Sequence, residues 1–310
     1  GKRTRNMCRG TIAGDPRLRA DEVGVPMLFA RTIQYEETVQ EFNKKRLLGY
    51  VQNGRKKYPG ATKIKKKISG TEYDVGSGRD FDLDTGDIVF RDMLDGDPVN
   101  FNRQPSLAIS NVSTHWAKVI RDETIMTIMI NVLCTPLYNA DFDGDAMHLI
   151  ICAGVAARNE IAELSTVSNW MISHSTSAPS IGQVEDSIVG CAEITRSKVR
   201  FNKYHAMLLC QSTSILPSFS DVGKDGISGR DCMSKLLADT PINFTRRATW
   251  YKQDMTPYIK YDPSEIHVKI DQGKILTGIL DKSSTGKKQT GGIYHIITNE
   301  YGATKALEVM

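Results

Sequence analysis

The apolar residues of this chain fall into short runs whose spacing changes along the sequence. Between residues 36 and 50, four apolar residues recur at helical spacing with polar residues between them: Val39, Phe42, Leu47 and Leu48. This pattern predicts an amphipathic helix over 36–50, which the glycines that follow would end. Enrichment in Ala, Glu and Leu predicts a second helix over Val155–Thr166.

Short strands are predicted between these helices, at Ile88–Phe90, Trp116–Ile120 and Thr127–Leu133. Residues 59–87 are rich in Gly, Lys and Asp, which predicts a loop or an edge-strand hairpin. The composition changes near residue 153, and the region beyond it mixes helical and strand patterns. The pattern therefore predicts an α+β protein with domains at 1–153 and 154–310, and with loops at 212–226 and 282–292.

Composition sets limits on the class of protein. The chain has 310 residues, of which 40% are hydrophobic, so it can bury one large core or two moderate ones. Its longest apolar runs are far shorter than the roughly 20 residues that span a bilayer, and no signal peptide is evident. We therefore expect no membrane association. The start at Gly1 suggests a processed product, an internal piece or an incomplete sequence.

The cysteines and methionines show no ligand pattern. None of the six cysteines forms a Cys-x-x-Cys pair or a Cys/His pair at zinc spacing. Reduced thiols in or near the core are the simplest interpretation. Methionines such as Met126, Met129 and Met147 are expected to fill gaps in the core.

Charge is distributed unevenly although the net value is only +4. Residues 1–67 contain 17 basic and 6 acidic residues, or +11, whereas the remainder contains 23 and 30, or −7. Such a basic segment favours contact with nucleic-acid phosphates. The alternative is an ordinary solvated surface, which we favour for the cluster at residues 63–67.

The most informative segment is Asn139–Asp145, in which Asp141, Asp143 and Asp145 alternate and Gly144 permits a tight turn. Three converging carboxylates call for a cation, and oxygen ligands favour a hard ion such as Mg²⁺, Ca²⁺ or Mn²⁺. An EF-hand loop is excluded because its sixth and twelfth positions would be Ala146 and Cys152. A second acidic cluster, at residues 80–84, lies in a polar run and is interpreted as a solvated loop.

The setting of this turn distinguishes it from the second cluster. It lies between two apolar runs, Ile125–Leu133 and Met147–Ile151, so we expect a partly buried turn between buried strands. The alternative is a merely exposed acidic turn. Three carboxylates leave room in the coordination shell, which suits Mg²⁺ and phosphoryl or nucleotidyl transfer.

The run Asn139–Asp145 resembles the signature of the largest subunit of multisubunit DNA-directed RNA polymerases. Further segments that resemble this family occur in its order: Gly1–Arg3, Ile12–Pro16, Glu22–Pro26, Tyr58–Ala61, Gly86–Asp87, Asp95–Leu107, Glu163–Leu164, Gly182–Asp186 and Gly291–His295. The resemblance covers essentially the whole chain and is closest to the eukaryotic and large-DNA-virus branch. The family usually has Glu where this chain has Ala146, and its N-terminal motif is altered at residues 4–9, so a divergent, viral homologue is suggested.

The resemblance implies a fold and a set of site residues. Residues 1–153 would form an active-site domain with a double-psi β-barrel, and 154–310 an incomplete, mixed α/β pore-like domain. The three aspartates would hold one Mg²⁺, and a second would enter with the nucleotide. The remaining implied roles are ribose contacts by Arg103 and Asn139 with Gln104 beside them, a turn stiffened by Pro105, and nucleic-acid contacts by Lys2, Arg3, Arg5 and Arg9.

The resemblance also implies partners and a location. They are the second-largest subunit, smaller subunits, the clamp, bridge helix and trigger loop of the largest subunit, template DNA, product RNA and ribonucleoside triphosphates. The location would be intracellular: the nucleus or, for a viral protein, the virion and the infected cytoplasm. The alternatives are a non-catalytic nucleic-acid-binding or assembly module of the same fold, and a single-chain polymerase with a related barrel.

Overall fold

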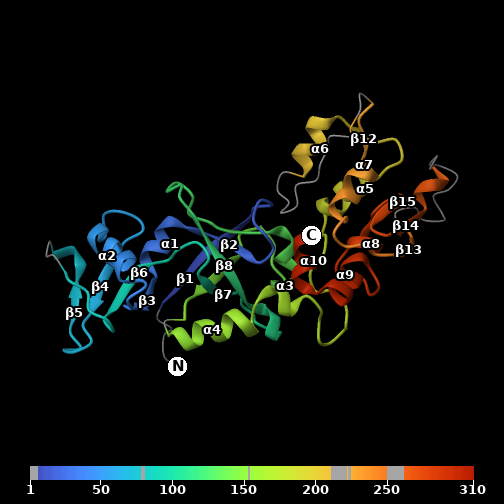
Figure 1. Ribbon diagram of the computed structural model, residues 1–310. Helices are drawn as coiled ribbons and strands as arrows, with labels where there is room; N and C mark the ends of the chain where they lie inside the picture. Colours follow the sequence, from blue (N-terminus) through green and yellow to red (C-terminus); the bar gives the residue numbers. More distant parts are fainter. Residues whose placement is uncertain (1–5, 78–80, 153, 211–221, 223–224, 250–261) are drawn as a thin grey trace. The chain divides into compact units, whose positions relative to one another are not determined.

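The computed structural model describes residues 6–77, 81–152, 154–210, 222, 225–249 and 262–310 (Figure 1). The chain divides into two compact units. Unit 1 comprises Gly1–Asn131 and Leu137–Val167, and unit 2 comprises Val132–Pro136 and Ser168–Met310. The division thus falls near residue 167, whereas the composition change lies near 153.

Unit 1 is built on a closed six-stranded barrel in the order β1-β10-β7-β8-β2-β9. Its strands are β1 (Met7–Gly14), β2 (Glu22–Pro26), β7 (Pro98–Asn102), β8 (Val112–Ile120), β9 (Ile128–Ile130) and β10 (Ala146–Ile150). The pairs β1–β9 and β2–β8 are parallel, and the other pairs are antiparallel. Burial alternates along β7 and β10, as one buried strand face requires. The predicted α+β class with a barrel is confirmed.

The imidazole of His115 on β8 is completely buried in unit 1. Its Nδ1 lies 3.3 Å from the Glu22 carbonyl oxygen, which can only accept, so Nδ1 donates. In a neutral ring Nε2 is then the acceptor for the Tyr138 hydroxyl at 2.6 Å. Phe101 packs edge-on against both rings. Burial lowers the pKa of His115 to about 4, so the ring is neutral near pH 7.

A second, four-stranded sheet in unit 1 has the order β3-β6-β4-β5. Its strands are β3 (Gln34–Thr38), β6 (Ile88–Asp92), β4 (Ala61–Lys65) and β5 (Glu72–Asp74). The predicted hairpin within 59–87 is confirmed as β4–β5. Helix α2 (Lys44–Asn53) packs on this sheet through Leu47 and Val51.

The helix predicted over 36–50 was wrong at its start. Residues 36–38 pair with β6, and α2 begins only at Lys44. The Asn43 side chain accepts the Gln40 N–H at 2.7 Å and donates to the Thr38 carbonyl at 3.0 Å, which shapes the turn between the two elements. Phe42 is 86% exposed, so its helical spacing was coincidental.

A buried guanidinium connects this sheet to the barrel strands. Arg91 of β6 donates to Glu37 at 2.5 Å and to both carboxylate oxygens of Asp97, just before β7, at 2.7 and 2.8 Å. It also lies over the ring of Tyr35 at 5.0 Å. A buried charge is tolerated only with such a full set of partners.

Two of the basic residues at 63–67 take part in ion pairs. Lys63 lies 3.4 Å from Glu72, and Lys66 lies 2.8 Å from Asp87. The exposed Lys63–Glu72 pair supports the solvated-surface interpretation, whereas Lys66 is half-buried and its partner Asp87 is buried. In the neighbouring acidic cluster, Asp82 and Asp84 are exposed while Leu83 is buried.

The remaining helices of unit 1 include α1 (Met27–Thr32) and α4 (Val155–Leu164), and the latter confirms the second predicted helix. Helix α3 spans Thr135–Tyr138. Across the described parts of both units, the 3₁₀ turns are Val75–Ser77, Ile109–Asn111, Val132–Cys134, Val167–Trp170 and Pro263–Glu265. Met147 is buried as predicted, but Met126 is 56% exposed because it lies before β9 rather than within it.

Unit 2 mixes helices with two small sheets. Strand β11 (Arg200–Phe201) pairs with β12 (Ile227–Ser228), and β13 (Phe244–Arg247), β14 (His267–Asp271) and β15 (Lys274–Thr277) form an antiparallel sheet. The helices are α5 (Asp186–Ile194), α6 (Lys203–Leu209), α7 (Gly229–Leu236), α8 (Lys282–Thr285), α9 (Ile293–Tyr301) and α10 (Ala303–Val309).

Two loops had been predicted in unit 2. The loop predicted at 282–292 was wrong at its start, because residues 282–285 form α8. Asp281 caps this helix by accepting the Ser283 N–H at 3.0 Å. Most of the segment at 212–226 lies outside the described residues. In the part of the chain that the structure describes, no helix is both long and apolar enough to cross a bilayer.

The burial of His115 predicts a pH dependence of stability. The unfolded chain takes up a proton near pH 6.5, whereas the folded state does so only near pH 4. Unfolding is therefore favoured as the pH falls from 6.5 to 4, and the loss of unfolding free energy should reach about 3 kcal/mol. Urea unfolding of the wild type and of His115→Gln at several pH values measures this contribution. Equal pH dependence in the two proteins would contradict the assignment.

Candidate metal centre

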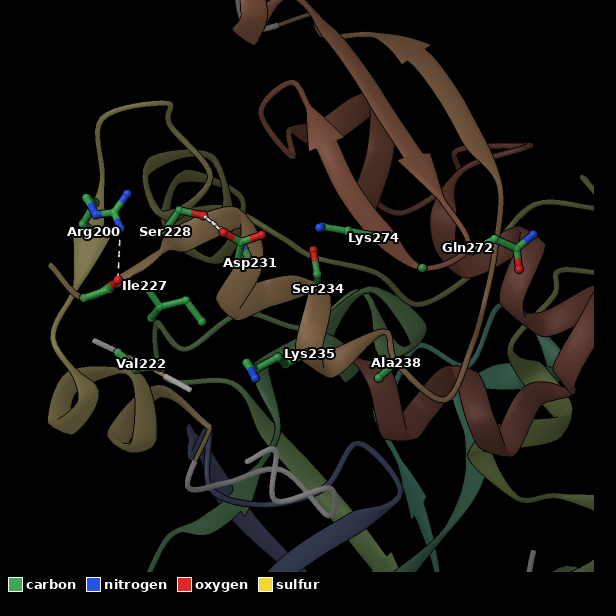
Figure 2. A pocket seen from close by; sticks show the side chains of 12 residues that line it. Arg200, Val222, Ile227, Ser228, Asp231, Ser234, Lys235, Ala238, Gln272 and Lys274 are labelled. Carbon is green, nitrogen blue, oxygen red and sulfur yellow. Dashed lines mark hydrogen bonds between the residues drawn. The ribbon is translucent and has the colours of Figure 1, made fainter. Parts of the chain in front are cut away.

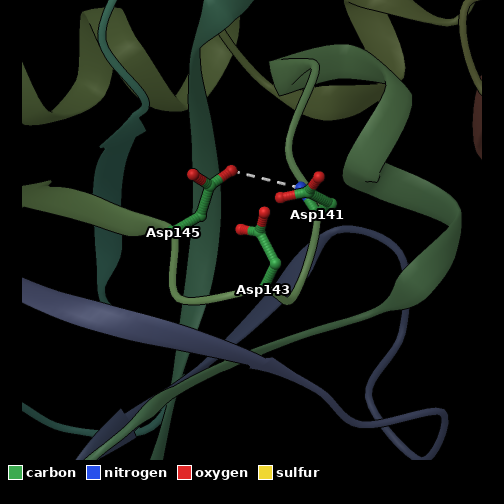
Figure 3. A group of neighbouring side chains, drawn as sticks. All are labelled: Asp141, Asp143 and Asp145. Carbon is green, nitrogen blue, oxygen red and sulfur yellow. Dashed lines mark hydrogen bonds between the residues drawn. The ribbon is translucent and has the colours of Figure 1, made fainter.

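The three aspartates converge on the turn before β10 (Figure 3). One carboxylate oxygen from each of Asp141, Asp143 and Asp145 lies within 4.8 Å of the other two. The flanking strands carry buried Ile128, Ile130, Met147 and Leu149, as predicted. The turn itself is more open than predicted, because Asp141 and Asp143 are exposed and only Asp145 is half-buried. The turn lies just before β10, at the end of the barrel strands. The side chains of those strands therefore do not cover the turn.

Two backbone positions shape the turn. Gly144 has a φ of +121°, a conformation that L side chains rarely adopt, and Asn139 has a φ of +48°, which Asn tolerates better than most residues. The carbonyl of Asp145 accepts the Ile12 N–H of β1 at 3.0 Å. The end of the turn is therefore fixed to the barrel wall.

Arg103 joins the carboxylates from the neighbouring strand. Its Nε donates to Asp145 Oδ2 at 2.7 Å, and its terminal Nη2 donates to Oδ1 at 3.1 Å. Strand β7 ends one residue before Arg103, β10 begins one residue after Asp145, and Asn102 pairs with His148 between them. The antiparallel register thus brings together two residues that are 42 positions apart.

The cluster carries a net negative charge, which favours the binding of a cation. The hydrogen bond from Arg103 lowers the pKa of Asp145. Sharing a hydrogen bond with Asp143, together with the nearby negative charges, raises the pKa of Asp141. With all three carboxylates ionised, Arg103 leaves a net charge of −2, which one divalent ion would neutralise.

The donor set fits a hard divalent ion. Around an octahedral Mg²⁺, adjacent oxygens lie about 3.0 Å apart and opposite oxygens about 4.2 Å apart. Because the three carboxylate oxygens lie within 4.8 Å of one another, they can share one ion once side-chain rotation brings them closer together. The exposure of the turn leaves coordination positions for water or for substrate oxygens.

The other predicted substrate-binding residues lie on the same two segments. Gln104 and Pro105 follow Arg103 on an exposed turn with a cis Gln104–Pro105 peptide, and Asn139 is exposed two residues before Asp141. The Ser106 hydroxyl donates to the Asn102 side chain at 2.7 Å across this turn. Arg103 thus reaches the carboxylates, while Gln104, Pro105 and Asn139 lie on the exposed segments beside them in sequence.

Of the four residues predicted to contact nucleic acid, the structure describes only Arg9. Lys2, Arg3 and Arg5 lie outside the described residues. Arg9 is exposed on β1, opposite His148 in the register with β10. Its strand therefore adjoins the one that follows the acidic turn.

Unit 2 contains a separate pocket of about 530 Å³ (Figure 2). Lys235 and Lys274 line it, as do Ser228 and Asp231, whose side chains bond to each other at 2.6 Å. Arg200 also lines it, but its guanidinium donates to the backbone carbonyls of Asp225 and Gly226. None of the residues predicted for the metal or substrate site lies in this pocket.

Sequence reasoning missed the pairing of Arg103 with Asp145. It had given Arg103 a role toward the substrate alone. The available signal was the alternation of polar and apolar residues at 98–103 and 145–150, which is compatible with adjacent strands but does not fix their register.

Comparison with known proteins gives matches over both units. Residues 1–167 match the family described as RNA polymerase Rpb1, domain 2, and residues 170–310 match RNA polymerase Rpb1, domain 3. The boundary between these matches agrees with the division of the structure into two units.

Individual relatives agree with these matches. The chain is 42% identical to an RPB1 homolog of African swine fever virus, aligned over 100% of this chain and 22% of the relative. It is 32% identical to DNA-directed RNA polymerase subunit 1 of Acanthamoeba polyphaga mimivirus, over 99% of this chain and 20% of that protein. Identity to an RPB1 subunit of RNA polymerase II from Trypanosoma brucei is 33%, over 98% and 17%.

The chain thus spans about a fifth of the length of the curated relatives that it matches. Both family matches and all three relatives describe the same subunit. The chain belongs to the Rpb1 family, the largest subunit of DNA-directed RNA polymerases.

Proposed function

We propose that this chain supplies the metal-binding carboxylates of a DNA-directed RNA polymerase and acts in DNA-templated nucleotidyl transfer. The observation that carries the proposal is the convergence of Asp141, Asp143 and Asp145 within 4.8 Å beside Arg103. Membership of the Rpb1 family supports the reaction class. The substrates would be ribonucleoside triphosphates and the 3′-hydroxyl of the growing RNA.

The three aspartates would hold one Mg²⁺, and a second ion would enter with the triphosphate. Magnesium, when bound, would lower the pKa of the attacking hydroxyl and neutralise charge on the phosphates. The chain's own residues would orient the reactants: Arg103 and Asn139 toward the ribose hydroxyls, with Gln104 beside them and Pro105 stiffening the turn. Contacts to the 2′-OH would distinguish ribose from deoxyribose.

The proposed activity requires a larger assembly. The described residues contain one cluster that could hold a metal, and two of its three carboxylates are exposed. We infer that the rest of the largest subunit, including the clamp, bridge helix and trigger loop, lies with the second-largest and smaller subunits around the DNA template and RNA product. The exposed Leu107 and Ile109 beside the Arg103 turn are consistent with burial against such a partner. The location would be the compartment where the assembled polymerase works: the nucleus or, for a viral enzyme, the virion and the infected cytoplasm.

Substitution of one ligand tests the proposal. Asp143→Ala in the assembled polymerase should reduce Mg²⁺-dependent, template-dependent ribonucleotide incorporation by roughly a hundredfold or more, because the ion loses a ligand and its position. The matched control is Asp82→Ala, which removes an exposed aspartate from the second acidic cluster and should leave incorporation unchanged. Wild-type activity of an assembled polymerase that carries Asp143→Ala would contradict the proposal. Nucleic-acid binding without incorporation by the wild type would favour a non-catalytic module.

The shape of the turn provides a second test. A Cβ at Gly144 would meet no atom within 4 Å, so only the φ of +121° opposes a side chain there. Gly144→Ala should therefore cost about 1–3 kcal/mol of local stability and weaken incorporation, since the turn relaxes to a different shape.

The control for this substitution is Gly49→Ala in α2. That position also has open space but no positive φ, so Ala should be neutral or stabilising by up to about 1 kcal/mol. Denaturant unfolding and incorporation assays on both variants measure these effects. Equal stability and activity of the two variants would show that the conformation of Gly144 is dispensable.

A further inference from the structure

Asp145 differs from the other two carboxylates because its oxygens already have defined donors. Oδ2 accepts Arg103 Nε–H at 2.7 Å and the Asp141 N–H at 3.2 Å, and Oδ1 accepts Arg103 Nη2–H at 3.1 Å. A carboxylate offers about four lone-pair positions, two on each oxygen. Three of these positions are thus in use, and Oδ2, which accepts the Asp141 N–H, is the oxygen on the side of Asp141 (Figure 3).

The guanidinium that makes these contacts is itself held in place. The Arg103 backbone directly follows β7. The Ser106 hydroxyl restrains the turn after it by donating to the Asn102 side chain. The Arg103 and Asp145 side chains are 20% and 19% exposed. In the otherwise similar two-pronged pair Arg17–Asp15, the arginine is 85% exposed and more strongly hydrated. The charges of the Arg103–Asp145 pair are thus less screened by water than those of Arg17–Asp15, and the Arg103 side chain has less freedom to move.

We propose that Arg103 is a positioning residue for the metal, because its two-pronged bond fixes the orientation of the Asp145 carboxylate beside Asp141 and Asp143. The inference rests on the proposed function. It is separate from any contact of Arg103 with a sugar, because it concerns the nucleotide-free site. Only two of the five guanidinium N–H groups are used by Asp145, so both roles can coexist.

A competing account is that Arg103 acts only through its charge. In that case it would repel an incoming cation, and its removal would tighten metal binding. Lysine distinguishes the two accounts, since it keeps the positive charge but lacks the planar fork that holds both oxygens. Positioning predicts weaker binding for both Arg103→Gln and Arg103→Lys, whereas charge alone predicts tighter binding for Gln and little change for Lys.

The experiment is a titration of the assembled, nucleotide-free polymerase with Mn²⁺, with free Mn²⁺ measured by electron paramagnetic resonance. The relevant site is the one that Asp143→Ala abolishes. At that site both Arg103 variants should bind Mn²⁺ about tenfold more weakly, the usual effect of losing a group that orients a ligand. Arg17→Gln removes the matched pair elsewhere in unit 1 and should bind as the wild type does.

The possible outcomes distinguish failure of the positioning role of Arg103 from failure of the proposed function. Tighter binding by Arg103→Gln, or wild-type affinity of Arg103→Lys, would overturn the positioning role while leaving the metal site intact. If Asp143→Ala abolishes no Mn²⁺ site, the proposed function fails first. Thermal unfolding of each variant alongside Arg17→Gln shows whether lost affinity reflects lost folding, and Arg103→Lys, the more conservative change, decides the question if Arg103→Gln fails to fold.

Discussion

Mutual repulsion of three carboxylates on one short turn is the constraint around which the candidate metal centre of unit 1 is organised. A flexible loop would relieve that repulsion by spreading its side chains. Here the turn is anchored where β10 lies between β1 and β7, and a glycine with positive φ closes it. One arginine from the adjacent strand end offsets part of the charge. The remaining negative charge is not balanced by any further cation on this turn, which is compatible with the proposed binding of a metal ion.

A second arginine of the same unit, Arg91, is buried and has a different role. Arg91 is enclosed by Glu37 and Asp97, which come from the four-stranded sheet and from the segment leading into β7. Its charge is fully compensated, so it can fix the sheet to the barrel strands but offers nothing to a ligand. The contrast with Arg103 shows how the same side chain is structural when buried among partners and available when placed at a strand end.

Much of this arrangement could be predicted from the sequence, and the failures have physical causes. The acidic turn, its glycine and its flanking buried strands depend on local patterns, and all three are found. Helical spacing over 36–50 was misleading because pairing of residues 36–38 with β6 outweighs local periodicity. The openness of the turn and the Arg103–Asp145 pair depend on which strands become neighbours. That information lies in the register between distant segments.

The order of strands in the barrel also governs how unit 1 can form during synthesis. Strand β1 has β9 and β10 as its neighbours, and both lie more than a hundred residues later in the chain. Its edges therefore remain unpaired until nearly half of this sequence has been made. Such long-range pairing is slow and exposes strand edges meanwhile. The charge of Arg9 within β1 disfavours edge-to-edge association of this strand while it is unpaired.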